Sequence, residues 1–150
     1  MIVLYEIVMN VLLLTALIIA AIYDYNRRII PIFIFPVLFL FITLLSVLTG
    51  QFHFWDSLLG VYIGFISFLM MAVFYGGGGG DIIMMSALGG ILGSRDVMYL
   101  IFASGLIYVV FSLIVLTAFS MKGKCRDALK KQYPYAPFVL AGWILLMLCK

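Results

Sequence analysis

Two aspartates, Asp24 and Asp81, are the side chains of this sequence that could best perform chemistry. Asp24 lies in "AAIYDYNRRIIP", and Asp81 follows the five glycines of "YGGGGGDII". Two carboxylates placed side by side cannot both ionise easily, so they share one proton. One member can then accept a proton while the other donates one, which is the work of a general base and a general acid.

The other four acids have plainer explanations. Each of them lies at an expected helix end or within a charged loop, where polar residues are common. We therefore expect helix caps, a solvated loop residue and a residue near the outer end of the first helix: Asp56 and Asp96, then Asp127, then Glu6.

Metal or cofactor chemistry is not expected. The chain has one histidine and two cysteines, without a Cys-x-x-Cys pair. His53 lies in "QFHFWDS", between aromatic residues typical of a membrane interface, so we do not expect it to be a ligand. Cys125 and Cys149 should lie at opposite ends of the last helix, too far apart for a disulfide.

Composition indicates an integral membrane protein. The chain is 67% hydrophobic and 10% charged, against about 45–50% apolar residues in soluble domains. A bilayer can cover so much apolar surface, and we expect one domain over residues 1–150. The net charge of +3 fits membrane topology and anionic lipid. No aromatic and basic surface suited to stacking bases is present, so nucleic acid is not an expected partner.

Hydrophobic runs predict an all-α, polytopic fold with about six transmembrane helices. A full span needs roughly 17–25 residues. The first, second, third and fifth runs reach that length, the sixth is slightly short, and the fourth has only twelve residues before Ser94. The glycines or residues near Arg95 should then lie partly at membrane depth. The six runs are Val3–Tyr23, Ile32–Leu48, Ser57–Phe74, Ile82–Gly93, Val97–Phe119 and Ala136–Cys149.

Basic residues predict the orientation. They gather between the first and second helices and between the fifth and sixth, so six spans place both loops on one face. The positive-inside rule makes that face cytosolic in a cytoplasmic or inner membrane, with both termini outside. The basic residues are Arg27 and Arg28 in one loop, and Lys122, Lys124, Arg126, Lys130 and Lys131 in the other.

Two spans separate Asp24 from Asp81, so both should reach the same cytosolic boundary and could meet. Ionisable groups at membrane depth are costly and are functional candidates. Structural alternatives remain open: Asp24 could only pair with Arg27 or Arg28, and Asp81 could only cap a helix. The loop Gly78–Gly80 would support the site by allowing close backbone approach. A flexible linker is possible, whereas a phosphate loop would need a lysine where Asp81 stands.

Three segments together resemble the type IV prepilin peptidases, a family of membrane aspartic proteases. "GGGD" at Gly78–Asp81 is similar to the family's Gly-x-Gly-Asp signature. "DYNRRIIP" at Asp24–Pro31 is similar to its segment of an Asp followed by basic residues and Ile-Pro-Asn, and "YPYAPFVLAG" at Tyr133–Gly142 to its Pro-Tyr/Phe-Gly/Ala-Pro segment. The sequence departs from the family pattern at Ile32, where Asn is usual, and at Ile83, where Lys is usual.

The resemblance implies a peptidase that uses Asp24 and Asp81 and needs no cofactor. Its substrate would be a prepilin-like membrane protein with a short basic leader, cut at the cytosolic boundary, usually after Gly. Larger relatives carry a cytosolic region with paired cysteines and methylate the new N-terminus; the short first loop here implies the peptidase-only type. Two alternatives remain: a presenilin-like intramembrane protease, and a non-enzymatic module such as a small transporter or assembly partner.

Overall fold

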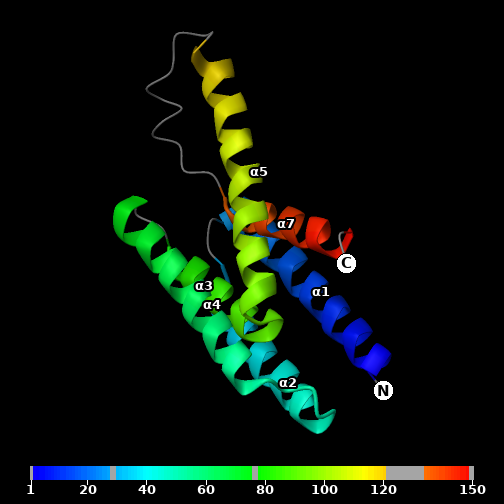
Figure 1. Ribbon diagram of the computed structural model, residues 1–150. Coiled ribbons are helices and arrows are strands. Elements are labelled where there is room, and N and C mark those ends of the chain that lie inside the picture. The colour runs from blue at the N-terminus through cyan, green and yellow to red at the C-terminus, as the bar shows by residue number, and fades with distance from the viewer. Residues whose placement is uncertain (1, 28–29, 76–77, 121–133, 149–150) are drawn as a thin grey trace.

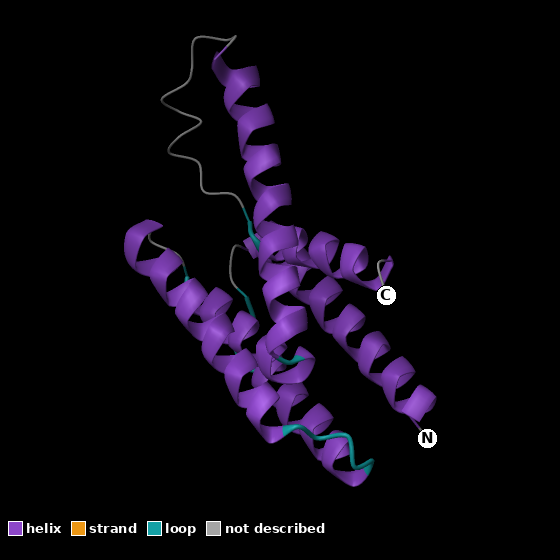
Figure 2. Cartoon of the chain, viewed as in Figure 1, coloured by secondary structure: helices purple, strands orange, loops and turns teal. Residues whose placement is uncertain are grey.

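The computed structural model describes residues 2–27, 30–75, 78–120 and 134–148, and within these ranges every regular element is a helix (Figures 1 and 2). This confirms the expected all-α fold and its six helices. Their bounds are α1 Ile2–Arg27, α2 Ile34–Leu48, α3 Phe54–Tyr75, α4 Gly79–Leu92, α5 Ser94–Ser120 and α7 Ala136–Leu148.

Three of these helices are long and apolar enough to cross a membrane: α1, α3 and α5. The expectation that the second hydrophobic run is a full-length helix is wrong, because α2 has only 15 residues. Its first two expected residues lie outside the helix, since the carbonyl of Pro31 accepts a bond from the N–H of Ile34 in a turn. Helices α2, α4 and α7 are shorter than a full span. That all six segments cross the membrane therefore stays a prediction.

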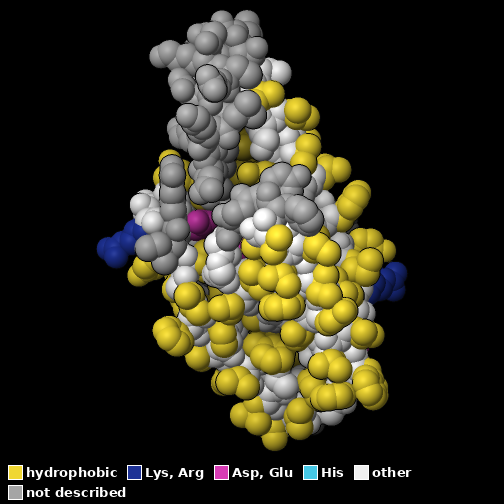
Figure 3. Space-filling model, turned by 90° about the vertical axis from the view of Figure 1, so that its left-hand side faces the viewer, with side chains coloured by type: hydrophobic (Ala, Val, Ile, Leu, Met, Phe, Trp, Pro, Cys, Tyr) yellow, Lys and Arg dark blue, Asp and Glu magenta, His cyan; other side chains and the backbone are white. Residues whose placement is uncertain are grey.

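The outer surface of the helices is apolar. Large side chains such as Phe33, Leu48 and Trp55 are mostly exposed, and hydrophobic side chains cover most of the face in Figure 3. A soluble protein rarely exposes continuous apolar surface of this kind. The chain is accordingly a membrane protein, whose exposed apolar side chains contact lipid.

Glycines hold α3 and α4 side by side, as Figure 1 shows. A Cβ on Gly60 would lie 2.0 Å from the carbonyl oxygen of Gly89, and one on Gly64 would lie 2.3 Å from that of Met85. Neither position can carry a side chain unless the two backbones separate. Small residues that let two helices approach closely are typical of helix–helix contacts within membranes.

The first and last described helices, α1 and α7, pack against each other in the core. In Figure 1, α7 crosses α5 and lies against α1. Trp143 of α7 is almost fully buried, as are Leu13 and Leu17 of α1. At Gly142 a Cβ would meet Ser104 of α5 at 3.0–3.3 Å, so α5 and α7 are also closely packed. This packing fixes the start of α7 beside the end of α1.

The structure at the junction of α4 and α5 shows that the capping roles expected for Asp56 and Asp96 are wrong. Asp56 lies inside the first turn of α3, and its carboxylate accepts bonds from the N–H and the hydroxyl of Ser94. It therefore caps α5 and not its own helix. Asp96 does not precede α5 but lies in its first turn. Helix α5 begins earlier than expected because a residue from another helix satisfies its first N–H.

Candidate active site

Asp24 lies near the C-terminal end of α1 and is only 7% exposed. Its Oδ2 atom accepts a hydrogen bond of 2.9 Å from the main-chain N–H of Ala136, the first residue of α7. An ion pair with Arg27 was one alternative for Asp24; Arg27 is exposed, and the hydrogen bond described for Asp24 goes to α7 instead. A buried carboxylate is costly unless such bonds compensate for lost water.

Asp81 is the third residue of α4 and is partly buried. Gly78, and not Asp81, is the N-cap residue of this helix, so the capping alternative for Asp81 does not hold. Its Oδ1 atom is buried and has no hydrogen-bond partner within the described part of the chain. A buried polar atom of this kind needs an explanation, such as a catalytic role.

The structure brings Asp24 and Asp81 together. Their carboxylates lie close enough for the charge of Asp24 to act on Asp81. The segments that carry them are also in contact, since a Cβ on Gly80 would lie 3.1 Å from the Cβ of Ile30, just beyond the end of α1. Two helices, α2 and α3, separate the two acids in sequence, and the fold returns them to one place.

The glycines contribute less than the sequence analysis expected. Gly79 and Gly80 belong to α4 and not to a loop. Only Gly80 is close-packed, because a Cβ at Gly79 would meet no atom within 4 Å. Gly78 has φ −76°, which any residue can adopt. Close approach at Gly80 is thus the one supporting role found for the described glycines of this run, Gly78–Gly80.

Tyr135 lies beside this site, directly before Ala136. It is buried, its hydroxyl lies 2.9 Å from that of Ser104 on α5, and its ring contacts Phe68 and Tyr108. Asp81 lies close enough to Tyr135 for the two side chains to interact electrostatically. The hydroxyl pair and the aromatic contacts hold the start of α7 in position beside both carboxylates.

Sequence reasoning missed the roles of Ala136 and Ser104. The segment around Ala136 was noted only as a family resemblance, and the group that binds Asp24 is a main-chain N–H, which no residue type reveals. Ser104 carries no distinguishing signal either, because several other apolar helices of this chain also contain a serine or threonine, such as Ser67 and Ser86. Ser104 is fully buried and donates to the carbonyl of Leu100.

Other polar residues lie far from this site. Glu6, His53 and Asp56 line a cavity of about 200 Å³. Glu6 is eighteen residues from Asp24 on α1, or roughly 27 Å along a helix. His53 thus lines a polar cavity, although it was expected only in an aromatic interface. Among the described residues, no group of acidic, histidine or cysteine side chains could hold a metal ion.

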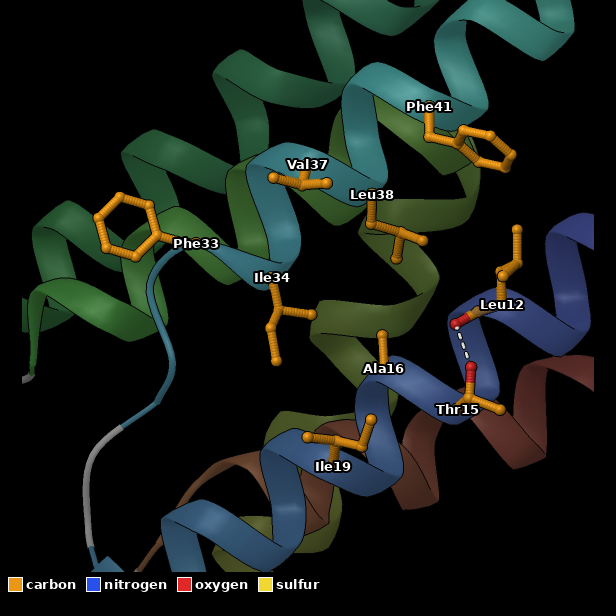
Figure 4. A pocket seen from close by; sticks show the side chains of 9 residues that line it. All are labelled: Leu12, Thr15, Ala16, Ile19, Phe33, Ile34, Val37, Leu38 and Phe41. Carbon is orange, nitrogen blue, oxygen red and sulfur yellow. Dashed lines mark hydrogen bonds between the residues drawn. The ribbon is translucent and has the colours of Figure 1, made fainter.

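An apolar groove of about 510 Å³ lies between α1 and α2 (Figure 4). The one hydroxyl in its lining, that of Thr15, is bonded to the carbonyl of Leu12. The groove can contact apolar chains but offers no group for catalysis. Its lining residues are Leu12, Thr15, Ala16, Ile19, Phe33, Ile34, Val37, Leu38 and Phe41.

Several expected features fall outside the described residues. These are the basic loop before α7 with Asp127, the two cysteines, Arg28, and the first two glycines of the run: 121–133, 149–150, 28 and 76–77.

A protein-family model matches more than half of the chain. The model described as the type IV leader peptidase family matches residues 11–113, which include both Asp24 and Asp81. No curated protein and no solved structure matches the chain.

Proposed function

Because the chain belongs to the type IV leader peptidase family, we propose that it is an aspartic peptidase that removes the short basic leader from prepilin-like precursors. Membership supports a protease related to leader peptidases. The aspartic mechanism rests on one observation: the buried Asp24 and the partly buried Asp81 lie close together, on segments that are in contact where Gly80 packs against Ile30.

The mechanism uses only the two aspartates and water. The pair shares one proton, and its ionised member takes a proton from a water molecule. The water oxygen bonds to the scissile carbonyl carbon, while the protonated member gives its proton to the carbonyl oxygen. The tetrahedral intermediate then collapses: the carbon–nitrogen bond breaks, the amine leaves with a proton from the pair, and one hydroxyl of the intermediate returns its proton to the pair as the carboxylic acid forms. No metal or cofactor takes part.

The substrate is a membrane protein whose apolar helix lies in the bilayer beside the enzyme. Its cut site follows a short basic leader and reaches the two aspartates at the cytosolic boundary. This placement requires the orientation derived from the basic loops, with both termini outside. The apolar outer surface of the helices is compatible with a substrate that approaches through lipid.

Cleavage should occur without methylation of the new N-terminus. The chain offers no region with paired cysteines, and its first loop is too short for a nucleotide-sized pocket.

The test is to incubate the purified protein with a candidate prepilin and follow the substrate by mass spectrometry. We expect loss of the leader mass, and no added methyl group when S-adenosylmethionine is supplied. An intact substrate would favour a non-enzymatic membrane module. A methyl group that depends on S-adenosylmethionine would refute the peptidase-only type.

A further inference from the structure

The two carboxylates of the site have different surroundings. Asp24 receives the N–H of Ala136 on its Oδ2 atom. The buried Oδ1 atom of Asp81 receives no bond from any described residue. A hydrogen bond donated to a carboxylate favours its charged form, whereas burial without a partner favours the neutral form. Within the described part of the chain the pair is therefore asymmetric.

The N–H of Ala136 is available because of how α7 begins. The carbonyl of Tyr135 accepts bonds from Phe138 and Val139. Pro137 has no N–H to offer. Within this first turn the N–H of Ala136 is left for a partner outside the helix, and Asp24 supplies it.

This donor is held rigidly. Ala136 is fully buried, and Tyr135 before it is fixed by its bond to Ser104 and by the rings of Phe68 and Tyr108. A preorganised donor stabilises charge without reorganisation during the reaction. The positive end of a helix dipole acts on both acids, α7 on Asp24 and α4 on Asp81, whereas the negative end of α1 opposes a charge on Asp24. The direct bond from Ala136 offsets that opposition and is the contact that Asp24 has and Asp81 lacks among the described residues.

We propose that Asp24 is the ionised member of the pair and that Asp81 carries the shared proton, with the main-chain N–H of Ala136 as the positioning group. The assignment rests on the proposed peptidase function. Asp24 then takes the proton from water, and Asp81 protonates the carbonyl oxygen of the substrate. The start of α7 is in this way a third part of the site.

The experiment removes the N–H of Ala136 without changing its side chain. Nonsense suppression with lactic acid places an ester at this position and keeps the methyl group. The same replacement at Ala141, later in α7, is the matched control for the cost of an ester in the helix. Prepilin processing is then measured against pH for the unmodified protein and both esters.

The sign of the expected shift follows from the assignment. Loss of the N–H disfavours ionised Asp24, so a higher pH is needed to ionise it. The acid limb of the profile should move up by about one pH unit, roughly a tenfold loss of rate below that limb. The alkaline limb should stay in place, and the Ala141 ester should move neither limb. An upward shift of the alkaline limb would show that Asp24 carries the proton and Asp81 is ionised. A lower rate with both limbs unchanged would show that the bond from Ala136 has only a structural role.

A second measurement does not depend on the ester. Infrared spectra of protein with ¹³C-labelled aspartate carboxyls report protonated carboxyls directly. At a pH where the unmodified protein is active, the protonated band should persist in Asp24→Asn and vanish in Asp81→Asn. The opposite pattern would overturn the assignment. Failure of the unmodified protein to cleave any prepilin would instead refute the proposed function itself.

Discussion

The carboxylate of Asp24 on α1 accepts the main-chain N–H of Ala136 at the start of α7, across 112 residues of sequence. The bond joins the first and last described helices beside Asp81. It could act only as a cap for α7, or it could also prepare Asp24 for catalysis. Asparagine separates the two roles, because its side-chain oxygen still accepts the N–H but cannot carry the charge.

Close packing of α3 on α4 predicts a large effect of one added methyl group. Gly60→Ala should lower stability by about 1–3 kcal/mol, because its Cβ would overlap the backbone at Gly89. Gly105→Ala is the control, since no atom lies within 4 Å of a Cβ there. It should be neutral or stabilise by up to about 1 kcal/mol. Thermal unfolding in detergent measures both; equal midpoints would contradict the α3–α4 contact.

The cap between Asp56 and Ser94 predicts a loss of stability without a loss of chemistry. Asp56→Ala removes the acceptor for the first N–H of α5 and should cost about 0.5–2 kcal/mol. Asp56→Asn keeps an acceptor and should cost less. Leader cleavage by the folded fraction should stay near normal in both variants. A severe loss of cleavage in well-folded Asp56→Asn would indicate a catalytic role for Asp56, at the start of α3 and away from Asp24 and Asp81, and would contradict the proposed site.

The hydroxyl pair of Tyr135 and Ser104 predicts a measurable coupling. Tyr135→Phe keeps the ring contacts and removes the bond of 2.9 Å, as does Ser104→Ala. Each should destabilise by about 1 kcal/mol. The double variant should be less destabilised than the sum of the singles, because both remove one bond. Strict additivity in unfolding measurements would show that the two hydroxyls do not interact.

Membrane orientation predicts different reactivity of the two cysteines. Cys125 belongs to the basic loop and should face the cytosol, whereas Cys149 should lie near the outer face. A membrane-impermeant thiol reagent applied to intact cells should spare Cys125 and react with it after lysis. Labelling of Cys125 before lysis would show that the orientation is the reverse of the predicted one, and it would contradict a site at the cytosolic face.

Hydrophobic patterning predicted the helices well and their ends poorly. Apolar runs report directly which segments lie in lipid or in a core, so each of the six helices among the described residues was predicted. Their starts depend on partners elsewhere: Asp56 of α3 extends α5 to Ser94, and Gly79 and Gly80 enter α4 despite their low helix propensity. Such partners are far apart in sequence and leave no local pattern.

The proximity of Asp24 and Asp81 was predicted by counting the hydrophobic runs between them. An even number of runs predicts that both acids lie at the same face of the membrane. The bond to Ala136 could not be predicted in this way. It depends on the path of α7 across α1 and α5, and its donor is a backbone group common to nearly every residue. Sequence could identify the pair of acids, whereas the asymmetry between them required the packing.

The central claim is that the two carboxylates act as one catalytic unit. Asp24→Asn and Asp81→Asn should each abolish leader cleavage, and the double variant should be little worse than either single. Folding should survive, because asparagine keeps the size of aspartate and removes a buried charge. Asp56→Asn and Asp96→Asn are the controls at other helix ends and should remain active.

The measurement that decides is the rate of prepilin processing by each variant at equal abundance in the membrane. The account predicts loss of processing in well-folded Asp24→Asn, where the bond to Ala136 persists without the charge, and equal loss in Asp81→Asn. Near-normal processing by either variant would contradict the two-aspartate mechanism and leave Asp24 as a cap for α7 alone.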